Sequence, residues 1–355
     1  MGLATGAFML SAVVLRPIVG GLLDRLGRRP FIVCGLILFA LAMYMYNWIG
    51  GIIALLGLRI LHGMSWAFST TAMITATTDM IPNARRGEGM GWFSLSTTLA
   101  MAIGPLYGLW VVENLSYHFM FLFAVALTVV AILLTLGAKM PFQPQRETRR
   151  IELFEKSVFP VTVTVFFLFI AYGGISAFIS LFADSIGVSA AVFFLAYAAT
   201  LALTRPLAGK LSDRHGESFV IVPSLIIAIV ALIVLSVSSG MMGVIVSAVL
   251  YGIGFGSAQP ALQAATIRLA RPDRKGVANA SLLTATDLGI GLGAILLGEV
   301  SQYLNYRVLF MVSAVSVFIC FLLFMIFVKR LLKDSAADSP KNNYYPSVVS
   351  KYEEK

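Results

Sequence analysis

Long apolar runs follow one another along almost the whole chain, separated by short charged stretches. In hydrocarbon a backbone must satisfy its own hydrogen bonds, so runs of about 20 apolar residues predict membrane-crossing helices. Charged residues make up only 12% of the 355 residues, against about 25% in a water-soluble domain. The sequence therefore predicts an all-α membrane protein with eleven spans, at roughly 2–22, 30–47, 51–78, 88–112, 117–138, 157–182, 188–211, 218–238, 241–269, 276–299 and 306–331.

The net charge of +9 comes from Lys and Arg gathered in alternate loops. No basic face of a soluble fold is present, so nucleic acid is not an expected partner. Cytoplasmic loops carry the excess of Lys and Arg, which predicts a multi-pass protein of the cell membrane with a cytoplasmic C-terminus. The basic loops include Arg25–Arg29, Arg85–Arg86, Lys139–Lys156, Lys210–Arg214 and Arg268–Lys275.

An internal repeat aligns the two halves of the chain at a shift of 189 residues. At this shift Arg16-Pro17 meets Arg205-Pro206, Asp24-Arg25 meets Asp213-Arg214, Gly87 meets Gly276 and Gly104 meets Gly293. The repeat indicates two six-helix halves related by an axis along the membrane normal. The first of these twelve helices is then expected to lie before Met1. The predicted organisation is a helical bundle at 1–138, a linker at 139–156, a six-helix bundle at 157–333 and a disordered tail at 334–355.

One loop motif stands at the same place in both halves. It reads Gly20-Gly-Leu-Leu-Asp24-Arg25-Leu-Gly27-Arg28-Arg29, and its second copy keeps Gly209, Asp213, Arg214 and Gly216. Glycine permits a tight turn at the membrane face, and an aspartate there can approach a helix N-terminus or an Arg.

This motif resembles the G-x-L-x-D-R-x-G-R-R signature of the major facilitator superfamily, and the resemblance covers about residues 1–333. It implies two pseudo-symmetric helical bundles, a secondary transporter rather than an enzyme, and no cofactor. It also implies a cytoplasmic gate in which Asp24 faces the helix that begins near Gly276. The gate residues that match the family pattern are Gly20, Asp24, Arg25, Gly27, Arg28, Asp79, Gly209, Asp213, Arg214 and Gly216.

Arg59 lies well inside the third predicted span and forms an R-x-x-x-G element with Gly63. An intramembrane Arg costs at least about 2.5–3.5 kcal/mol unless a cavity or carboxylate compensates it. The resemblance implies a part in proton coupling, and a structural Arg bonded to helix carbonyls is the alternative.

Gly104, Pro105 and Gly108 form part of an element that resembles one typical of exporters in the family. Ala100 and Leu109 replace its outer glycines. Small residues allow close helix approach and Pro permits a bend. The element favours export, and a packing kink without bearing on direction is the alternative.

Asp287 is the acid that lies deepest in a predicted span, and its own helix places no Lys or Arg near it. Desolvation favours the neutral form of an unpaired carboxylate, so we expect Asp287 to carry a proton or to meet a cationic substrate group. Arg16 and Arg205 lie one to two turns from the cytoplasmic end, where a long side chain can reach the interface; we expect them to be structural.

Further polar or aromatic residues inside spans are candidates for lining a cavity: His62, Trp66, Tyr107, Tyr172, Gln259, Gln263 and Asn279. No ATP-binding loop, catalytic motif or metal-ligand cluster is visible in the sequence. The favoured function, which the family resemblance implies, is proton-coupled export, by antiport, of small organic molecules from a bacterial cell. A monomer in the lipid bilayer is expected, with protons and a small-molecule substrate as its partners. Import of a sugar or organic acid, or a truncated fragment that does not transport, are the alternatives.

Overall fold

The computed structural model describes residues 2–140 and 154–337, and these residues are almost entirely helical. The first half of the chain forms α1 (Gly2–Leu26), α2 (Arg29–Met45), α3 (Ile52–Met80), α4 (Arg86–Asn114) and α5 (Tyr117–Gly137). The second half forms α6 (Phe159–Ser185), α7 (Ala190–His215), α8 (Glu217–Val237), α9 (Met241–Leu269), α10 (Lys275–Tyr303) and α11 (Tyr306–Leu323). A π-helical turn, Phe324–Val328, joins α11 to α12 (Lys329–Ala337).

Nine helices in the described residues are long and apolar enough to cross a membrane. The eleven expected spans are thus confirmed in nine places. The other two are α2, whose 17 residues fall short of the usual length, and α4. The α12 helix continues to Ala337, so residues 334–337 are helical and the tail begins later than expected. Residues 338–355 and most of the linker lie outside the described residues.

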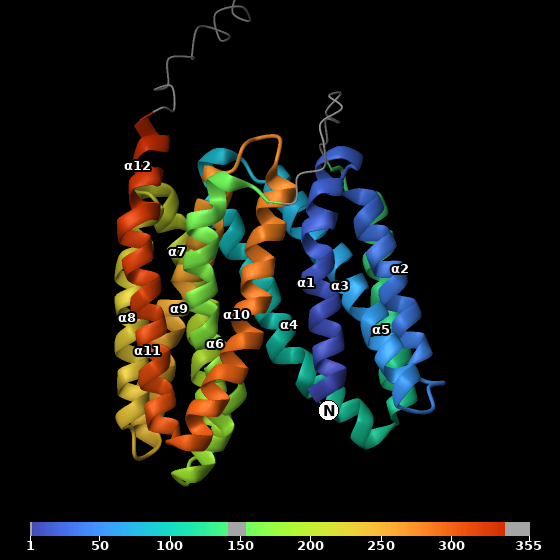
Figure 1. The fold of residues 1–355 in the computed structure, drawn as a ribbon. Helices are drawn as coiled ribbons and strands as arrows, with labels where there is room; N and C mark the ends of the chain where they lie inside the picture. Colours follow the sequence, from blue (N-terminus) through green and yellow to red (C-terminus); the bar gives the residue numbers. More distant parts are fainter. Residues whose placement is uncertain (1, 141–153, 338–355) are drawn as a thin grey trace, which may run out of the picture.

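The helices stand side by side with their long axes roughly parallel (Figure 1). In this view α6, α8 and α11 lie on one side, and α1, α2 and α5 on the other, with α4 and α10 between them. The loop after α1, the start of α10 and the ends of the linker all lie at the same end of the molecule, which the charge pattern assigns to the cytoplasm. Two helix pairs from different halves make the most extensive contacts: α1 packs on α10, and α4 packs on α7. The α3 helix also touches α10, and α4 also touches α9.

The two halves differ in how well their helices are covered. In the second half, α6 packs against α10 and α11, and Gly293 on α10 lies directly against the backbone of Ile170 on α6. Gly104 on α4 is the repeat partner of Gly293, yet a Cβ added at Gly104 or Gly108 would meet no atom of another helix within 4 Å. Among the described residues, the first half therefore has an open face where the second half holds α6.

Candidate functional site

Asp24 joins the end of α1 to the start of α10. Its carboxylate oxygens accept hydrogen bonds from the backbone N–H groups of Gly276 (2.8 Å) and Val277 (3.0 Å). These donors belong to the first turn of α10, where N–H groups lack helical partners and the helix dipole favours an anion. The helices approach so closely here that a Cβ on Gly276 would meet Asp24 and the Gly20 carbonyl. Asp24 thus lies where the family resemblance placed it.

Arg28 extends this contact to α3. Its Nε lies 2.9 Å from Asp79 Oδ2 and its Nη2 lies 3.4 Å from Asp24 Oδ1. Lys275 Nζ contacts the same Asp79 carboxylate at 3.0 Å. We call Asp24, Arg28, Asp79 and Lys275 the first latch, because they connect α1, α3 and α10 through charged groups at one end of the molecule.

The second half builds a matching arrangement around Asp213. Its carboxylate accepts the N–H groups of Gly87 (2.6 Å) and Glu88 (2.8 Å) at the start of α4. Glu217 and Arg268 form an ion pair at 2.6 Å. These two residues are the repeat partners of Arg28 and Asp79, so the pair is kept with its charges exchanged. We call Asp213, Glu217 and Arg268 the second latch.

The remaining motif residues either form the turns after α1 and α7 or lie exposed at the surface. Gly27 and Gly216 have φ values of 92° and 86°, a left-handed region that glycine adopts without a steric penalty. Arg25 and Arg214 are exposed at the end of their helices. The motif therefore divides into glycines that allow the turn, an aspartate that contacts the other half, and exposed cations.

Arg16 and Asp287 form an ion pair between α1 and α10, deep within both helices. Arg16 Nε lies 2.8 Å from Asp287 Oδ2, and the two side chains are 1% and 11% exposed. Arg16 Nη1 donates to the hydroxyls of Thr70 (3.1 Å) and Thr71 (3.2 Å) on α3. The expectation of an unpaired Asp287 was wrong, because its partner comes from the other half and not from its own helix. Arg16 does not reach toward the interface either.

Arg205 occupies the corresponding position between α7 and α4 and is also buried. Its Nη1 donates to the Ser94 carbonyl and the Thr98 hydroxyl, and its Nη2 donates to Gln259 Oε1 at 2.5 Å. Thr98 is the repeat partner of Asp287, and Gln259 is that of Thr70. Both arginines thus contact the same two positions, with a carboxylate at one interface and neutral groups at the other.

Arg59 lies beside an aromatic ring. Its guanidinium carbon lies 5.5 Å from the centre of the Tyr46 ring, and its Nε is buried without a hydrogen-bond partner. His62, one turn further along α3, meets the rings of Phe8 and Phe39 edge to face. Within residues 2–140 and 154–337 the structure shows no hydrogen bond from Arg59 to a carboxylate or a helix carbonyl, and its part in proton coupling stays a prediction.

The other lining candidates fall into different environments. Tyr172 stacks on Phe255 within the second half, and Asn279 Nδ2 donates to Thr75 Oγ1 between α10 and α3 at 3.3 Å. Gln263 is buried, whereas Trp66 and Tyr107 are partly exposed. Gly104 and Gly108 lie on the open face of α4, and the side chain of Pro105 lies outside the described residues.

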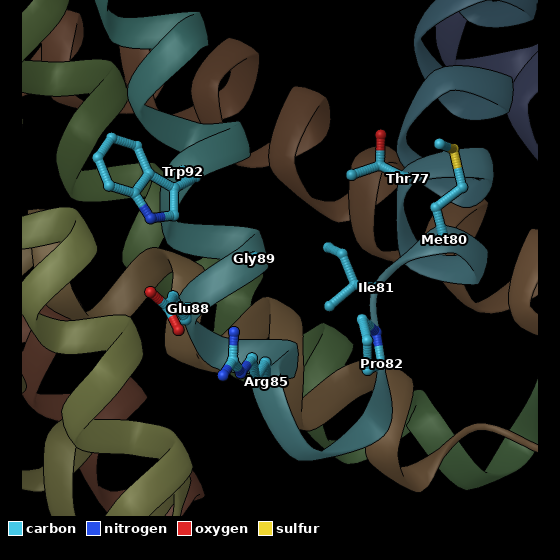
Figure 2. A pocket seen from close by; sticks show the side chains of 8 residues that line it. All are labelled: Thr77, Met80, Ile81, Pro82, Arg85, Glu88, Gly89 and Trp92. Atoms are coloured by element: carbon cyan, nitrogen blue, oxygen red, sulfur yellow. The ribbon is translucent and has the colours of Figure 1, made fainter. Parts of the chain in front are cut away.

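A hollow of about 430 Å³ lies between the end of α3 and the start of α4, and Figure 2 shows the side chains that line it. Ile81 and Pro82 line one side, and Glu88 and Trp92 line the other. Arg85 also borders it; its repeat partner Arg274 forms an ion pair with Glu155, next to the start of α6. The hollow lies at the latch end of the molecule and not beside Arg16 and Asp287.

Several of these contacts were not anticipated from the sequence: the Arg16–Asp287 pair, Thr98, the exchanged pair Glu217–Arg268, and Lys275. The 189-residue repeat holds a usable signal for some of them. Asp79 and Arg268 align, as do Arg28 and Glu217, and such simultaneous charge reversal at two aligned positions indicates a contact.

Membrane-spanning helices in two related halves, joined by latches at one end and with polar pairs buried between the halves, define a multi-pass membrane transporter. The family model described as Major Facilitator Superfamily matches this chain over residues 1–203 and 161–352. The chain belongs to that superfamily, whose members bind small-molecule substrates within a membrane and are not enzymes.

Curated relatives of similar sequence include proteins named for export or for drug resistance. The staphylopine export protein of Staphylococcus aureus is 26% identical, with 93% of this chain and 87% of that protein covered. The quinolone resistance protein NorA of the same species is also 26% identical, with 84% of this chain and 80% of that protein covered.

Solved structures share the fold at lower identity. The human organic anion transporter MFSD10 aligns with a TM-score of 0.79 and 17% identity, covering 91% of this chain and 83% of that one. The fucose:proton symporter FucP of E. coli aligns with a TM-score of 0.76 and 16% identity, covering 93% and 90%.

Proposed function

We propose that this protein exports small organic molecules in exchange for protons, and that Asp287 carries the proton. The observation on which the proposal depends is the Arg16–Asp287 ion pair at 2.8 Å between the two halves. A carboxylate at this place changes the attraction between α1 and α10 whenever it gains or loses a proton.

The energetics of a buried ion pair make such a switch effective. Removing one partner of a buried pair typically costs about 3–5 kcal/mol, because the other charge is left uncompensated. Protonation of Asp287 neutralises one partner and leaves Arg16 with the hydroxyls of Thr70 and Thr71. The α1–α10 interface then loses its strongest deep contact, which favours separation of the halves at that interface and alternating access to a central site.

The latches have a different task in this proposal. Asp24 and Asp213 bind backbone N–H groups at one end of the molecule, so they hold that end closed while the other end admits or releases substrate. We place this end at the cytoplasm on the charge pattern of the loops. The same pattern supports a cytoplasmic C-terminus. We also propose that the protein is a monomer with helical bundles at 1–138 and 157–333.

Two findings support export as the direction. Curated relatives carry export or drug-resistance names, and the Gly104–Gly108 element resembles that of exporters. Direct transport is the test: purified protein is reconstituted into liposomes with a pH gradient, and the fluxes of ethidium and fluorescein are followed as a cationic and an anionic dye.

Asp287→Asn is the informative variant, and Thr98→Asn is its matched control at the other interface. We expect Asp287→Asn to lose flux driven by the pH gradient while it retains exchange of labelled for unlabelled dye, since exchange needs no net proton movement. Thr98→Asn should keep both. Full gradient-driven flux in Asp287→Asn would remove Asp287 from the coupling mechanism, and dye movement toward the opposite side would identify an importer.

A further inference from the structure

We infer that Asn279 keeps the contact between α3 and α10 ready to open, because its buried amide oxygen finds a hydrogen-bond donor only when the two halves separate there. The inference rests on the proposed function, since alternating access requires the latch end to open. It adds a residue that sets how readily the latch end opens, beside Asp287, which in that proposal sets when it opens.

Asn279 lies one helical turn inside the first latch. Lys275 stands four residues before Asn279 on α10, and Asp79 stands four residues after Thr75 on α3. Residues four apart lie on the same face of a helix. The Lys275–Asp79 ion pair at 3.0 Å and the hydrogen bond from Asn279 Nδ2 to Thr75 Oγ1 at 3.3 Å are therefore successive links between α10 and α3. A separation that breaks the first link reaches the second one next.

The Thr75 hydroxyl fixes which way the Asn279 amide is turned. It donates its only proton to the Thr71 carbonyl at 2.7 Å, so toward Asn279 it can only accept. The amide group that faces it is then the Nδ2 donor. The amide oxygen Oδ1 is left on the other side, where it is buried and accepts no hydrogen bond from the described residues.

Both side chains are enclosed by the molecule. Asn279 and Thr75 are each 0% exposed, and they lie between α3 and α10, away from the open face that carries Gly104 and Gly108 on α4. Atoms of the chain therefore already surround the amide. Its oxygen lacks a donor because of the chemistry of these neighbours and not because the site is uncovered.

The internal repeat shows that the fold does not require an amide at this depth. The repeat partners of Asn279 and Thr75 are Met90 on α4 and Ala264 on α9. These two residues are 0% and 1% exposed, so apolar side chains pack at the corresponding positions of the other half. Asn279 thus brings an unsatisfied acceptor to a position where a methionine packs without one.

The energetic consequence depends on the state of the interface. A buried acceptor without a donor costs more free energy than one hydrogen bond returns. This cost applies only while the halves are latched, since water can donate to Oδ1 once α3 and α10 separate. Apolar residues have the opposite effect, because their exposure to water opposes separation. Asn279 therefore lowers the free energy of opening on the side of the molecule that contains Asp287.

The first test exchanges the residue pairs of the two halves. Asn279→Met/Thr75→Ala gives the α3–α10 contact the residues of the second half, and Met90→Asn/Ala264→Thr is the reverse exchange. Spin labels are attached to cysteines that replace Leu26 and Phe219, which are exposed and belong to different halves. The full chain, with Cys34 and Cys320 replaced by Ala, is placed in lipid nanodiscs, and pulsed electron paramagnetic resonance measures the distances between labels. We expect the first exchange to lower the ratio of open to latched molecules about tenfold, and the reverse exchange to raise it.

The second test uses the sign of two stability changes. Asn279→Leu removes the unsatisfied oxygen and nearly keeps the shape, so it should raise the melting temperature by about 2 °C or more. Thr75→Val removes the acceptor for Nδ2 and leaves the whole amide without a partner, so it should lower the melting temperature. An ordinary stabilising hydrogen bond would instead make both variants less stable.

A lower melting temperature in Asn279→Leu would overturn the inference, because it would mean that a donor such as a bound water already satisfies Oδ1 in the latched state. An unchanged ratio of open to latched molecules after the first exchange would overturn it as well. The proposed function fails separately, because these measurements use neither substrate nor a pH gradient. A chain whose opening follows Asn279 but whose flux does not depend on Asp287 keeps this inference and loses the proton coupling.

Discussion

The two interfaces between the halves, α1 with α10 and α4 with α7, dock through the same backbone features but carry different chemistry. In each, an aspartate near the end of one helix accepts two backbone N–H groups from the start of the other. In each, glycines bring the backbones into contact, Gly20 with Gly276 and Gly87 with Gly209. Close docking at these ends therefore depends on elements that the repeat preserves.

The difference lies deeper in the helices. Arg16 meets the carboxylate of Asp287, whereas Arg205 meets the hydroxyl of Thr98. Because the α4–α7 interface forms around a buried Arg with neutral partners, a carboxylate is not a requirement of this packing. The comparison teaches that Asp287 provides something other than helix docking, and a titratable group between the two halves is suited to the proton coupling proposed above.

Asp287→Thr should have the largest effect. It gives the α1–α10 interface a threonine, the residue that Thr98 provides at the α4–α7 interface. We expect gradient-driven flux to fall by about 100-fold or more. This is the rate change expected if the activation free energy of transport rises by roughly 3 kcal/mol. Flux in liposomes with and without a pH gradient measures the effect. The double variant Arg16→Gln/Asp287→Thr should recover thermal stability without recovering flux; if it recovers flux, the charge pair is not the coupling element.

Arg16→Gln and Arg205→Gln compare the two arginines directly. Arg16→Gln leaves a buried carboxylate unpaired and should destabilise the protein by about 3–5 kcal/mol. Arg205→Gln leaves only neutral partners, at a cost of about 1–3 kcal/mol. Melting temperatures of the purified variants in one detergent rank the two. Equal losses would mean that the two interfaces are energetically equivalent despite their chemistry.

Asp24→Asn weakens the first latch without touching the deep pair. The neutral amide keeps one hydrogen-bond acceptor but loses the charge that favours the helix N-terminus, a loss of about 1.4 kcal/mol or roughly tenfold in turnover. We expect turnover to slow with little change in substrate affinity, as measured by concentration dependence of flux. Asp213→Asn provides the matched variant, and a large affinity loss with unchanged turnover would place Asp24 at the substrate instead.

The smallest effect is expected from exchanging the charges of the first latch. Arg28→Glu alone places a third carboxylate beside Asp24 and Asp79 and should reduce stability by about 1–2 kcal/mol. Arg28→Glu/Asp79→Arg recreates the order seen in Glu217 and Arg268 and should restore flux to within about twofold. If the double variant elutes as a folded protein in size-exclusion chromatography but its flux stays low, then Lys275 needs a carboxylate at position 79.

The general architecture was accessible from the sequence because its causes are local. Apolar runs of span length, the glycine turns after α1 and α7, and the loop motif each depend on residues close in the chain. The repeat then related the two halves. The α2 helix fell short of span length, and the helix at 329–337 extended into the predicted tail, since helix ends depend on capping and neighbours more than on composition.

The sequence by itself determined the membrane class, the two related halves, the superfamily and the gate motif, since hydropathy and motif spacing are properties of contiguous residues. Only the tertiary structure decided that Arg16 is the partner of Asp287, that Arg205 meets Thr98, and that Arg59 has no counter-ion among the described residues. Arg16 and Asp287 lie 271 positions apart. A charge in a span must be compensated, but which helix supplies the compensation depends on how the helices pack against one another.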